Sequence, residues 1–284
     1  MTTGAVQPTT VTEPDTKSPI TSAIKSAITP ATKPDASDEA PRRPFRLRDL
    51  TPLLLIRAAH PRLAVVTAVL LAVAAALSGR PDRELLLVLV TVLVGQVILG
   101  WFNDLIDRAR DARHQRAGKP LADGRLDPGT LWFCLALAVF LVVPLSVGNG
   151  LYAGIAYLGS LAIGVAGQWR WLRTGFFSWL PWAAAFALYP AFLSYGGWGG
   201  QEHGAPPEPL LIGLAALLGI GVHFLTALWG LVADREDGWT YLPLRLGLRI
   251  GASRLLWVAG SYTVLVLVGL AVAGSYVGLA RDAL

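Results

Sequence analysis

The sequence has 284 residues, of which 54% are hydrophobic and only 15% are charged, and its mean hydropathy is +0.52. Soluble domains carry about 25% charged residues, so this composition excludes an ordinary soluble protein and predicts an integral membrane protein. The net charge is +5, but the basic residues lie in short segments between apolar runs, as topology-setting charge does. We therefore expect no nucleic-acid partner. The single cysteine, Cys134, excludes an intrachain disulfide.

Residues 1–42 are predicted to form a disordered cytoplasmic tail. The segment is rich in Thr, Ser, Pro, Ala and Lys and has almost no aromatic residues, so it cannot bury enough apolar area to fold. It also lacks the apolar core of a secretory signal, because the first long hydrophobic run begins near Leu53. We expect the tail to be followed by a transmembrane domain over residues 43–284.

Seven apolar segments follow the tail, each near the ~20 residues that a helix needs to cross a bilayer. They cover residues 53–77, 84–106, 129–147, 151–168, 176–195, 210–232 and 253–279. We therefore predict an all-α fold, a polytopic bundle of about seven transmembrane helices.

The distribution of Lys and Arg predicts how this bundle is oriented. These residues gather before the first span and between spans two and three, four and five, and six and seven. The loops between spans three and four and between five and six carry none. By the positive-inside rule the N-terminus and the polar ends of spans two and six lie in the cytoplasm. We expect a multi-pass protein of the plasma membrane.

The end of the second span carries the strongest functional signal. Asn103, Asp107 and Asp111 recur every four residues, so on a helix they share one face, and Asp104 flanks that face. Acidic groups at the mouth of a membrane helix are costly and usually functional. Three or four oxygen ligands on one face suit Mg²⁺, which commonly bridges to substrate phosphates. The alternative is a solvated helix end whose acids pair with neighbouring arginines.

These residues also carry a resemblance to a known family. The stretch Asn103-Asp104-x-x-Asp107-x-x-x-Asp111, followed by Lys119-Pro120-Leu121-Ala122-Asp123-Gly124-Arg125, resembles the UbiA superfamily of intramembrane prenyltransferases. The resemblance covers about residues 45–260 and continues through Tyr189-Pro190-Ala191-Phe192, His223-Phe224-Leu225 and Leu242-Pro243-Leu244-Arg245-Leu246-Gly247. It implies a helical bundle, commonly of nine spans, around a cavity that opens to the membrane.

The resemblance further implies a Mg²⁺-dependent enzyme that removes diphosphate from a prenyl diphosphate and transfers the prenyl group to a lipophilic, usually aromatic, acceptor. An allylic diphosphate ionises only if the leaving charge is neutralised. The implied metal ligands are Asn103, Asp107, Asp111 and Asp234, and of these Asp107, Asp111 and Asp234 are the implied catalytic residues. The implied diphosphate-binding residues are Arg113, Arg116 and Lys119, with Asp104 beside them. Topology-setting charge explains the three basic residues equally well.

The second acidic motif departs from the family pattern. Aligned through His223 and Asp234, the chain reads Thr226-x-x-x-Gly230-x-x-x-Asp234, where family members usually have three Asn or Asp residues. Only the last carboxylate is kept, and Glu236 and Asp237 project on other faces of a helix. We therefore expect a second Mg²⁺ to be poorly held.

Two alternative functions remain open at this stage. A membrane terpene cyclase of the same family would act on the prenyl diphosphate without an acceptor. A catalytically impaired relative would bind a prenyl lipid or a partner enzyme, and Thr226, Gly230 and the short C-terminal part favour it. Elsewhere, we expect His223 to be a hydrogen-bonded interior histidine and His60 to lie at the membrane interface.

Overall fold

The computed structural model describes Met1 and residues 50–196 and 204–278. Apart from Met1, the predicted tail therefore lies outside the described residues. Residues 50–196 and 204–278 belong to one compact unit, Arg46–Leu284, and within these two ranges the regular secondary structure is helical, with no strand. The predicted all-α fold class is confirmed.

The first predicted span consists of two helices, α2 (Thr51–Ala58) and α3 (Pro61–Leu77), which are bent by 63° at the break between them. His60 stands at this break with a left-handed backbone conformation, φ 53°. Pro61 begins α3, where its fixed φ and missing N–H are tolerated. The polar His-Pro pair inside the apolar run therefore marks a sharp bend.

The second predicted span is α4 (Asp82–Arg113), which continues well past its predicted end at Ile106. Its 32 residues make a helix about 48 Å long, which exceeds the roughly 30 Å hydrocarbon core of a bilayer. The acidic stretch therefore lies within one continuous helix, as its four-residue spacing predicts, in the turns that project beyond the apolar part.

The remaining helices alternate long spans with short segments at their ends. They are α5 (Pro128–Gly148), α6 (Leu151–Gly167), α7 (Arg170–Arg173), η2 (Phe176–Trp179), α8 (Leu180–Ala187), α9 (Tyr189–Ser194), α10 (Pro209–Ala227), α11 (Leu231–Glu236), α12 (Leu242–Ile250) and α13 (Ala252–Val277). The sixth predicted span, residues 210–232, thus ends at Ala227, and its last residues start the separate helix α11.

Five described segments are long and apolar enough to cross a membrane, namely α4, α5, Phe176–Ser194, α10 and α13. The bent pair α2 and α3 makes a sixth if it is one span, and α6 is an apolar helix of 17 residues. Each of the seven predicted apolar segments is therefore a helix, a bent pair or a broken helix.

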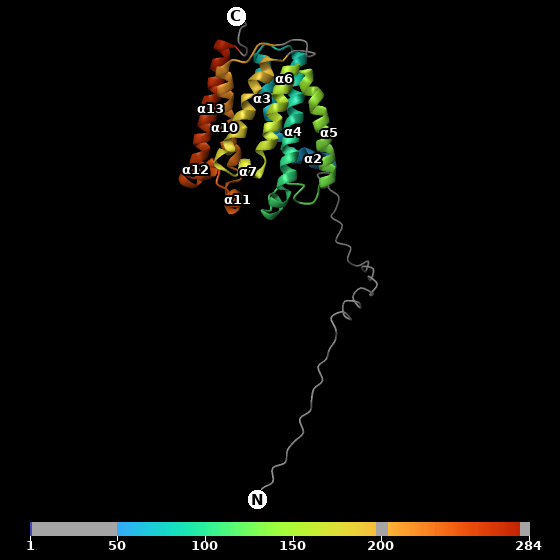
Figure 1. Ribbon diagram of the computed structural model, residues 1–284, viewed down its shortest axis with the longest axis vertical. Helices are drawn as coiled ribbons and strands as arrows, with labels where there is room; N and C mark the ends of the chain where they lie inside the picture. The colour runs from blue at the N-terminus through green and yellow to red at the C-terminus, as the bar shows by residue number, and fades with distance from the viewer. Residues whose placement is uncertain (2–49, 197–203, 279–284) are drawn as a thin grey trace. The chain divides into compact units, whose positions relative to one another are not determined.

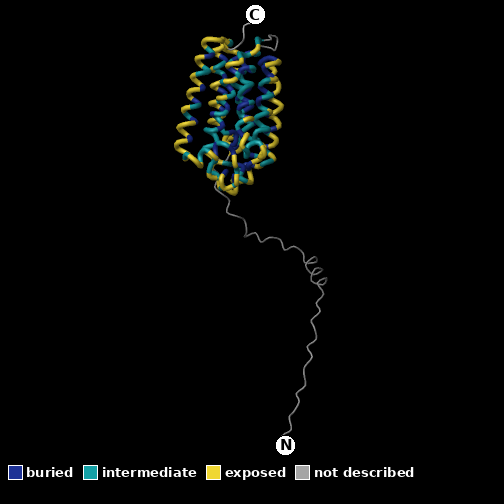
Figure 2. The backbone as a smooth tube through the Cα atoms, turned by 60° about the vertical axis from the view of Figure 1, so that its left-hand side comes forward, coloured by how far each residue is buried: buried dark blue, intermediate teal, exposed yellow. Residues whose placement is uncertain are grey.

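The long helices run side by side and pack in an order that follows the chain (Figure 1). Helix α3 packs on α4, α4 on α5, α5 on α6, α6 on α8 and α9, α8 on α10, and α10 on α13. Buried residues gather inside the bundle, whereas exposed residues line its outer helices (Figure 2). Large apolar side chains such as Phe140 and Trp257 are exposed there, as expected of a surface that faces lipid. The short helices α2, α7, α11 and α12 lie at one end of the bundle, which we call the site end (Figure 1).

Candidate functional site

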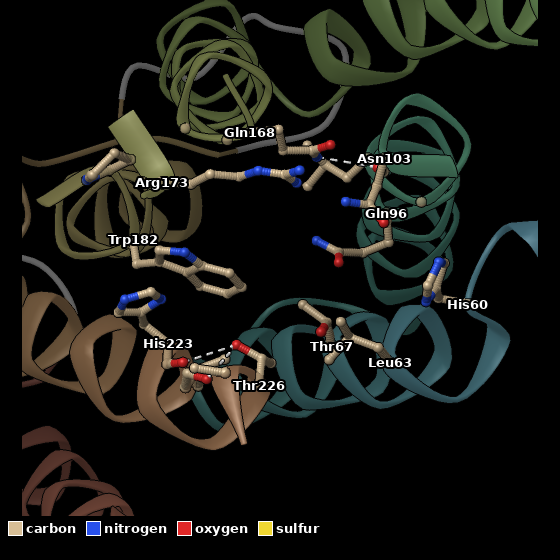
Figure 3. Close-up of a pocket in the computed structure, with 18 of the residues that line it drawn as sticks. His60, Leu63, Thr67, Gln96, Asn103, Gln168, Arg173, Trp182, His223 and Thr226 are labelled. Atoms are coloured by element: carbon tan, nitrogen blue, oxygen red, sulfur yellow. Dashed lines mark hydrogen bonds between the residues drawn. The ribbon is translucent and has the colours of Figure 1, made fainter. Parts of the chain in front are cut away.

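A cavity of about 550 Å³ lies between α3, α4, α6, α8 and α10. Part of its wall is apolar and aromatic and includes Leu63, Leu99, Leu161, Trp182 and Phe186. Three basic residues, Arg116, Lys119 and Arg173, line it as well. In Figure 3 the guanidinium of Arg173 reaches toward Asn103 and Gln168, while Trp182 and His223 lie on another wall. The cavity thus joins a basic region to an apolar one.

The three carboxylates of the first motif are buried beside this basic region, with Asp104, Asp107 and Asp111 only 2%, 5% and 1% exposed. The carboxylate of Asp107 accepts hydrogen bonds from both terminal nitrogens of Arg173. Nη1 lies 3.0 Å from Oδ2, and Nη2 donates to Oδ1. Such fork-to-fork pairs fix geometry as well as charge. Asn103 Nδ2 also donates to Asp107 Oδ2, at 3.2 Å. The short helix α7 therefore brings a cation onto the centre of the motif.

Lys119 joins the other two carboxylates. Its Nζ lies 2.5 Å from Asp104 Oδ1 and 3.5 Å from Asp111 Oδ2. His60 Nε2 lies 2.9 Å from the same oxygen of Asp104, and Arg116 Nε lies 3.6 Å from Asp111 Oδ1. Asp104 Oδ2 and Asp111 Oδ1 are buried without a hydrogen-bond partner. Buried acceptors are seldom left unpaired, so these two oxygens have capacity for a further cation or donor.

His60 reaches Asp104 because the bend between α2 and α3 touches α4 directly. A Cβ at Gly100 would lie 2.7 Å from the carbonyl oxygen of Ala59, closer than real Cβ atoms come to backbone oxygen. Only glycine allows the two backbones to meet there. The histidine expected at the membrane interface therefore lines the cavity.

The second motif is arranged differently. The hydroxyl of Thr226 donates to the backbone carbonyls of Val222 and His223, at 2.9 and 3.1 Å, and Gly230 stands at the break before α11. Asp234 is 5% exposed. Its Oδ1 accepts from Arg110 Nη2 at 2.5 Å, and its Oδ2 accepts from the hydroxyl of Tyr241. Both oxygens of the one carboxylate in this motif therefore already accept hydrogen bonds from protein groups.

Arg110 connects Asp234 to Asp237, whose Oδ2 accepts from Arg110 Nε. This hydrogen bond from Arg110, together with a smaller contribution from His114 Nε2, 3.1 Å from Asp237 Oδ1, lowers the pKa of Asp237 to about 2. Burial, together with the neighbouring carboxylate of Asp234, raises the pKa of Tyr241, so its hydroxyl stays a donor at neutral pH. The ring of Trp239 lies 4.3 Å from the guanidinium carbon of Arg110 and 4.9 Å from that of Arg173.

The structure separates the predicted site residues into three groups. Those lining the cavity are Asn103, Arg116, Lys119 and Asp234. Asp104, Asp107 and Asp111 lie behind them in contact with its basic side chains. Arg113 is 70% exposed and lies 3.7 Å from Asp237, outside the cavity lining. In the part of the chain that the structure describes, no three His, Cys, Asp or Glu side chains are grouped to hold a metal ion.

Sequence reasoning missed five residues of this site, which are His60, Arg110, Arg173, Trp239 and Tyr241. Arg173 has the same sequence signature as any basic residue that sets topology, and Trp239 resembles an interfacial aromatic residue. The prediction for His223 is confirmed, since it is buried with Nε2 3.0 Å from Ser178 Oγ, although it also lines the cavity.

Comparison with known proteins bears on this arrangement. The family model described as the UbiA prenyltransferase family matches residues 64–281. A UbiA homolog from Archaeoglobus fulgidus bound to GPP and Mg²⁺ has a similar structure, with a TM-score of 0.61, 17% sequence identity and 80% of each chain covered. The same homolog bound to DMAPP and Mg²⁺ gives a TM-score of 0.58 at 17% identity over 79% of this chain and 80% of that one. At these identities the likeness shows a shared fold. Among curated proteins, none matches the chain.

Proposed function

Because the chain belongs to the UbiA prenyltransferase family, we propose that it is a membrane prenyltransferase that releases diphosphate from a prenyl diphosphate and transfers the prenyl group to a lipophilic, aromatic acceptor. The observation that carries this proposal is the cavity, in which Arg116, Lys119 and Arg173 line the same space as Trp182 and Phe186. A prenyl diphosphate needs that combination, because its head is anionic and its tail is a hydrocarbon.

The basic residues would bind the diphosphate directly. Arg173 supports this role, because its Nε is buried without a hydrogen-bond partner and the residue lines the cavity. Hydrogen bonds between ionised partners are roughly twice as strong as neutral ones. Arg116 and Lys119 approach from the loop after α4, so the diphosphate would be held from two sides.

Two carboxylate oxygens of the first motif would accept a Mg²⁺ ion, although no group of three metal-ligating side chains is formed in the described residues. Asp104 Oδ2 and Asp111 Oδ1 are buried carboxylate oxygens without a hydrogen-bond partner, and Mg²⁺ binds one or two carboxylates while keeping several waters. We propose that Asn103, Asp107 and Asp111 hold the ion, with Asp104 assisting, and that the oxygens of Asp107 become available when Arg173, which bonds both of them, turns to the diphosphate. When bound, it would neutralise the charge that develops on the leaving diphosphate.

The aromatic wall would serve the organic half of the substrate. The aromatic rings of Phe186 and Tyr189 lie 5.1 Å apart, centroid to centroid, and Trp182 lies 6.5 Å from Phe186. The faces of such rings attract a cation, and an allylic carbocation is the species left when diphosphate departs. The apolar side chains around them exclude water, which would otherwise capture that cation.

We further propose that this site faces the cytoplasm, with the protein in the plasma membrane. Within residues 50–196 and 204–278, the loops and short helices near the site carry most of the basic residues, including Arg116, Lys119, Arg125, Arg170, Arg173 and Arg235. The turn between α3 and α4 carries only Arg80 beside Arg83 at the start of α4. This asymmetry follows the positive-inside rule.

Diphosphate release by the purified chain tests the proposal. The chain would be incubated with Mg²⁺ and a panel of prenyl diphosphates of increasing length, and Asp107→Ala would be compared with Asp123→Asn, which changes an exposed acid of the next loop. We expect release by the parent chain and by Asp123→Asn, and its loss in Asp107→Ala. Absence of release with every donor would contradict the proposal and favour a lipid-binding relative. A cyclic hydrocarbon formed from the donor alone would favour a terpene cyclase.

A further inference from the structure

The acidic site has two halves, the first motif on α4 (the first half) and the second motif, Thr226, Gly230 and Asp234 (the second half). In the second half, where an acidic motif would face a metal ion, lies the positively charged side chain of Arg110. Of the three positions of the second motif, Thr226 uses its hydroxyl on its own helix and Gly230 has no side chain. Asp234 keeps a carboxylate, but both oxygens are bonded, one to Arg110 and one to Tyr241. The residues present therefore do not fit a second divalent ion.

Arg110 is fixed in this position by several independent contacts. Its Nη2 bonds Asp234, its Nε bonds Asp237, and its guanidinium lies over the ring of Trp239 at 4.3 Å. The side chain is only 11% exposed. A buried guanidinium is stable only when it is paired, and here two carboxylates supply the pairing. Because α4 itself carries Arg110, the cation sits on a rigid element beside the first motif.

Gly230 belongs to the same arrangement. A Cβ at this position would lie 2.6 Å from Oδ2 of Asp234, so the carboxylate of Asp234 occupies the space of a side chain at position 230. An aspartate there, as the family pattern has, would push Asp234 away from Arg110 and Tyr241. Gly230 thus leaves free the space in which Asp234 bonds Arg110.

We propose that the guanidinium of Arg110, held by Asp234 and Asp237, takes the place of a second metal ion, so that the chain binds a prenyl diphosphate with no more than one divalent ion. This inference rests on the proposed function, because it specifies how the same site balances its charge. Arg110 is a positioning residue in this scheme. It fixes Asp234 and Trp239, and through Trp239 it supports Arg173, which contacts the cavity.

Counting bound Mn²⁺ tests the proposal. Mn²⁺ substitutes for Mg²⁺ at oxygen sites and is visible by electron paramagnetic resonance. The full chain in detergent would be titrated with Mn²⁺ in the presence of geranyl thiolodiphosphate, a donor analogue that resists ionisation. We expect about one Mn²⁺ per chain. In the triple variant Arg110→Leu, Thr226→Asn, Gly230→Asp, which removes the guanidinium and rebuilds the motif, we expect the count to rise to about two.

The controls keep the outcomes distinct. Arg108→Leu removes an exposed arginine of the same helix and should leave the count unchanged, and Arg110→Lys, which keeps a cation, should also leave it unchanged. Two ions bound to the parent chain with the analogue would overturn the inference and leave the proposed function intact. Failure of the parent chain to bind the analogue at all would overturn both. The count on the parent chain decides the matter even if the triple variant does not fold.

Discussion

The two halves of the acidic site neutralise buried carboxylates with different kinds of partner. On α4, Asp104 and Asp111 each keep one buried oxygen without a hydrogen-bond partner, and their shared cation, Lys119, comes from the loop that follows. In the second half both oxygens of Asp234 are bonded, and its cation, Arg110, is part of α4. Asp104 and Asp111 therefore keep oxygens for a further ligand, whereas Asp107, bonded by Arg173, and Asp234 do not. A carboxylate at a membrane helix end therefore indicates a required positive charge, and its surroundings decide whether protein or metal supplies it.

Removing a carboxylate from each half should give unequal effects on turnover, and this is the largest effect we expect. Asp111→Asn should slow diphosphate release by about 100-fold or more, because electrostatic stabilisers of a transition state are typically worth 10²–10³-fold. Asp234→Asn should cost about tenfold or less, because both oxygens of Asp234 bond protein groups, Arg110 and Tyr241, and neither is left for a metal ion. Steady-state release assays on both variants measure the difference. Equal losses would contradict the distinction between the halves.

Arg173 tests whether the basic wall of the cavity binds the diphosphate. Arg173→Met should weaken binding of a prenyl diphosphate by about 10- to 100-fold, because hydrogen bonds to charged groups contribute about 1.5–3 kcal/mol. Arg170→Met is the matched control, since Arg170 lies on the same short helix and is exposed. Isothermal titration with the thiolodiphosphate analogue measures both affinities. Equal affinities would show that Arg173 serves only to pair Asp107.

Trp239 links the halves, because its ring lies near the guanidinium groups of both Arg110 and Arg173. Trp239→Leu removes two cation–π contacts, each worth roughly 0.5–1 kcal/mol, so we expect a stability loss of about 1–2 kcal/mol and a lower melting temperature. Trp239→Phe keeps an aromatic face and should recover part of the loss. A leucine variant as stable as the parent would mean that the ring does not couple the two arginines.

The placement of the first motif on one face of α4 follows from the repeat of the helix and was therefore predictable from the sequence. The four-residue spacing of Asn103, Asp107 and Asp111 fixes a common face on any helix, and the structure places all three on one helix. The polar residues His60 and Pro61 within an apolar run mark the break between α2 and α3, although residues 53–77 were predicted to form one span. These features depend only on neighbouring residues.

The partners of these carboxylates depend on contacts between distant segments, which periodicity does not encode. Arg170 and Arg173 have the same charge in the same loop, yet only Arg173 reaches Asp107, 66 residues earlier in the chain. His60 meets Asp104 only because Gly100 lets two backbones touch. Arg110 is one of the neighbouring arginines that the alternative interpretation would pair with the acids of α4, but its hydrogen bonds run to Asp234 and Asp237.

The smallest effect we expect is that of Glu236, which lies at the exposed edge of the second half. Glu236 lies 3.2 Å from His114 Nδ1, but its side chain is 62% exposed, whereas the adjacent Asp237 is 15% exposed and bonded to Arg110. Exposed ion pairs contribute about 0–1 kcal/mol, so Glu236→Gln should change the melting temperature very little. Asp237→Asn should lower it clearly, because the substitution leaves a buried guanidinium half paired. Thermal unfolding of both variants in the same detergent makes the comparison. Similar losses of melting temperature in the two variants would mean that Glu236 also belongs to the ion-pair network. The charge of Arg110 would then be balanced by more than the two aspartates that hold it.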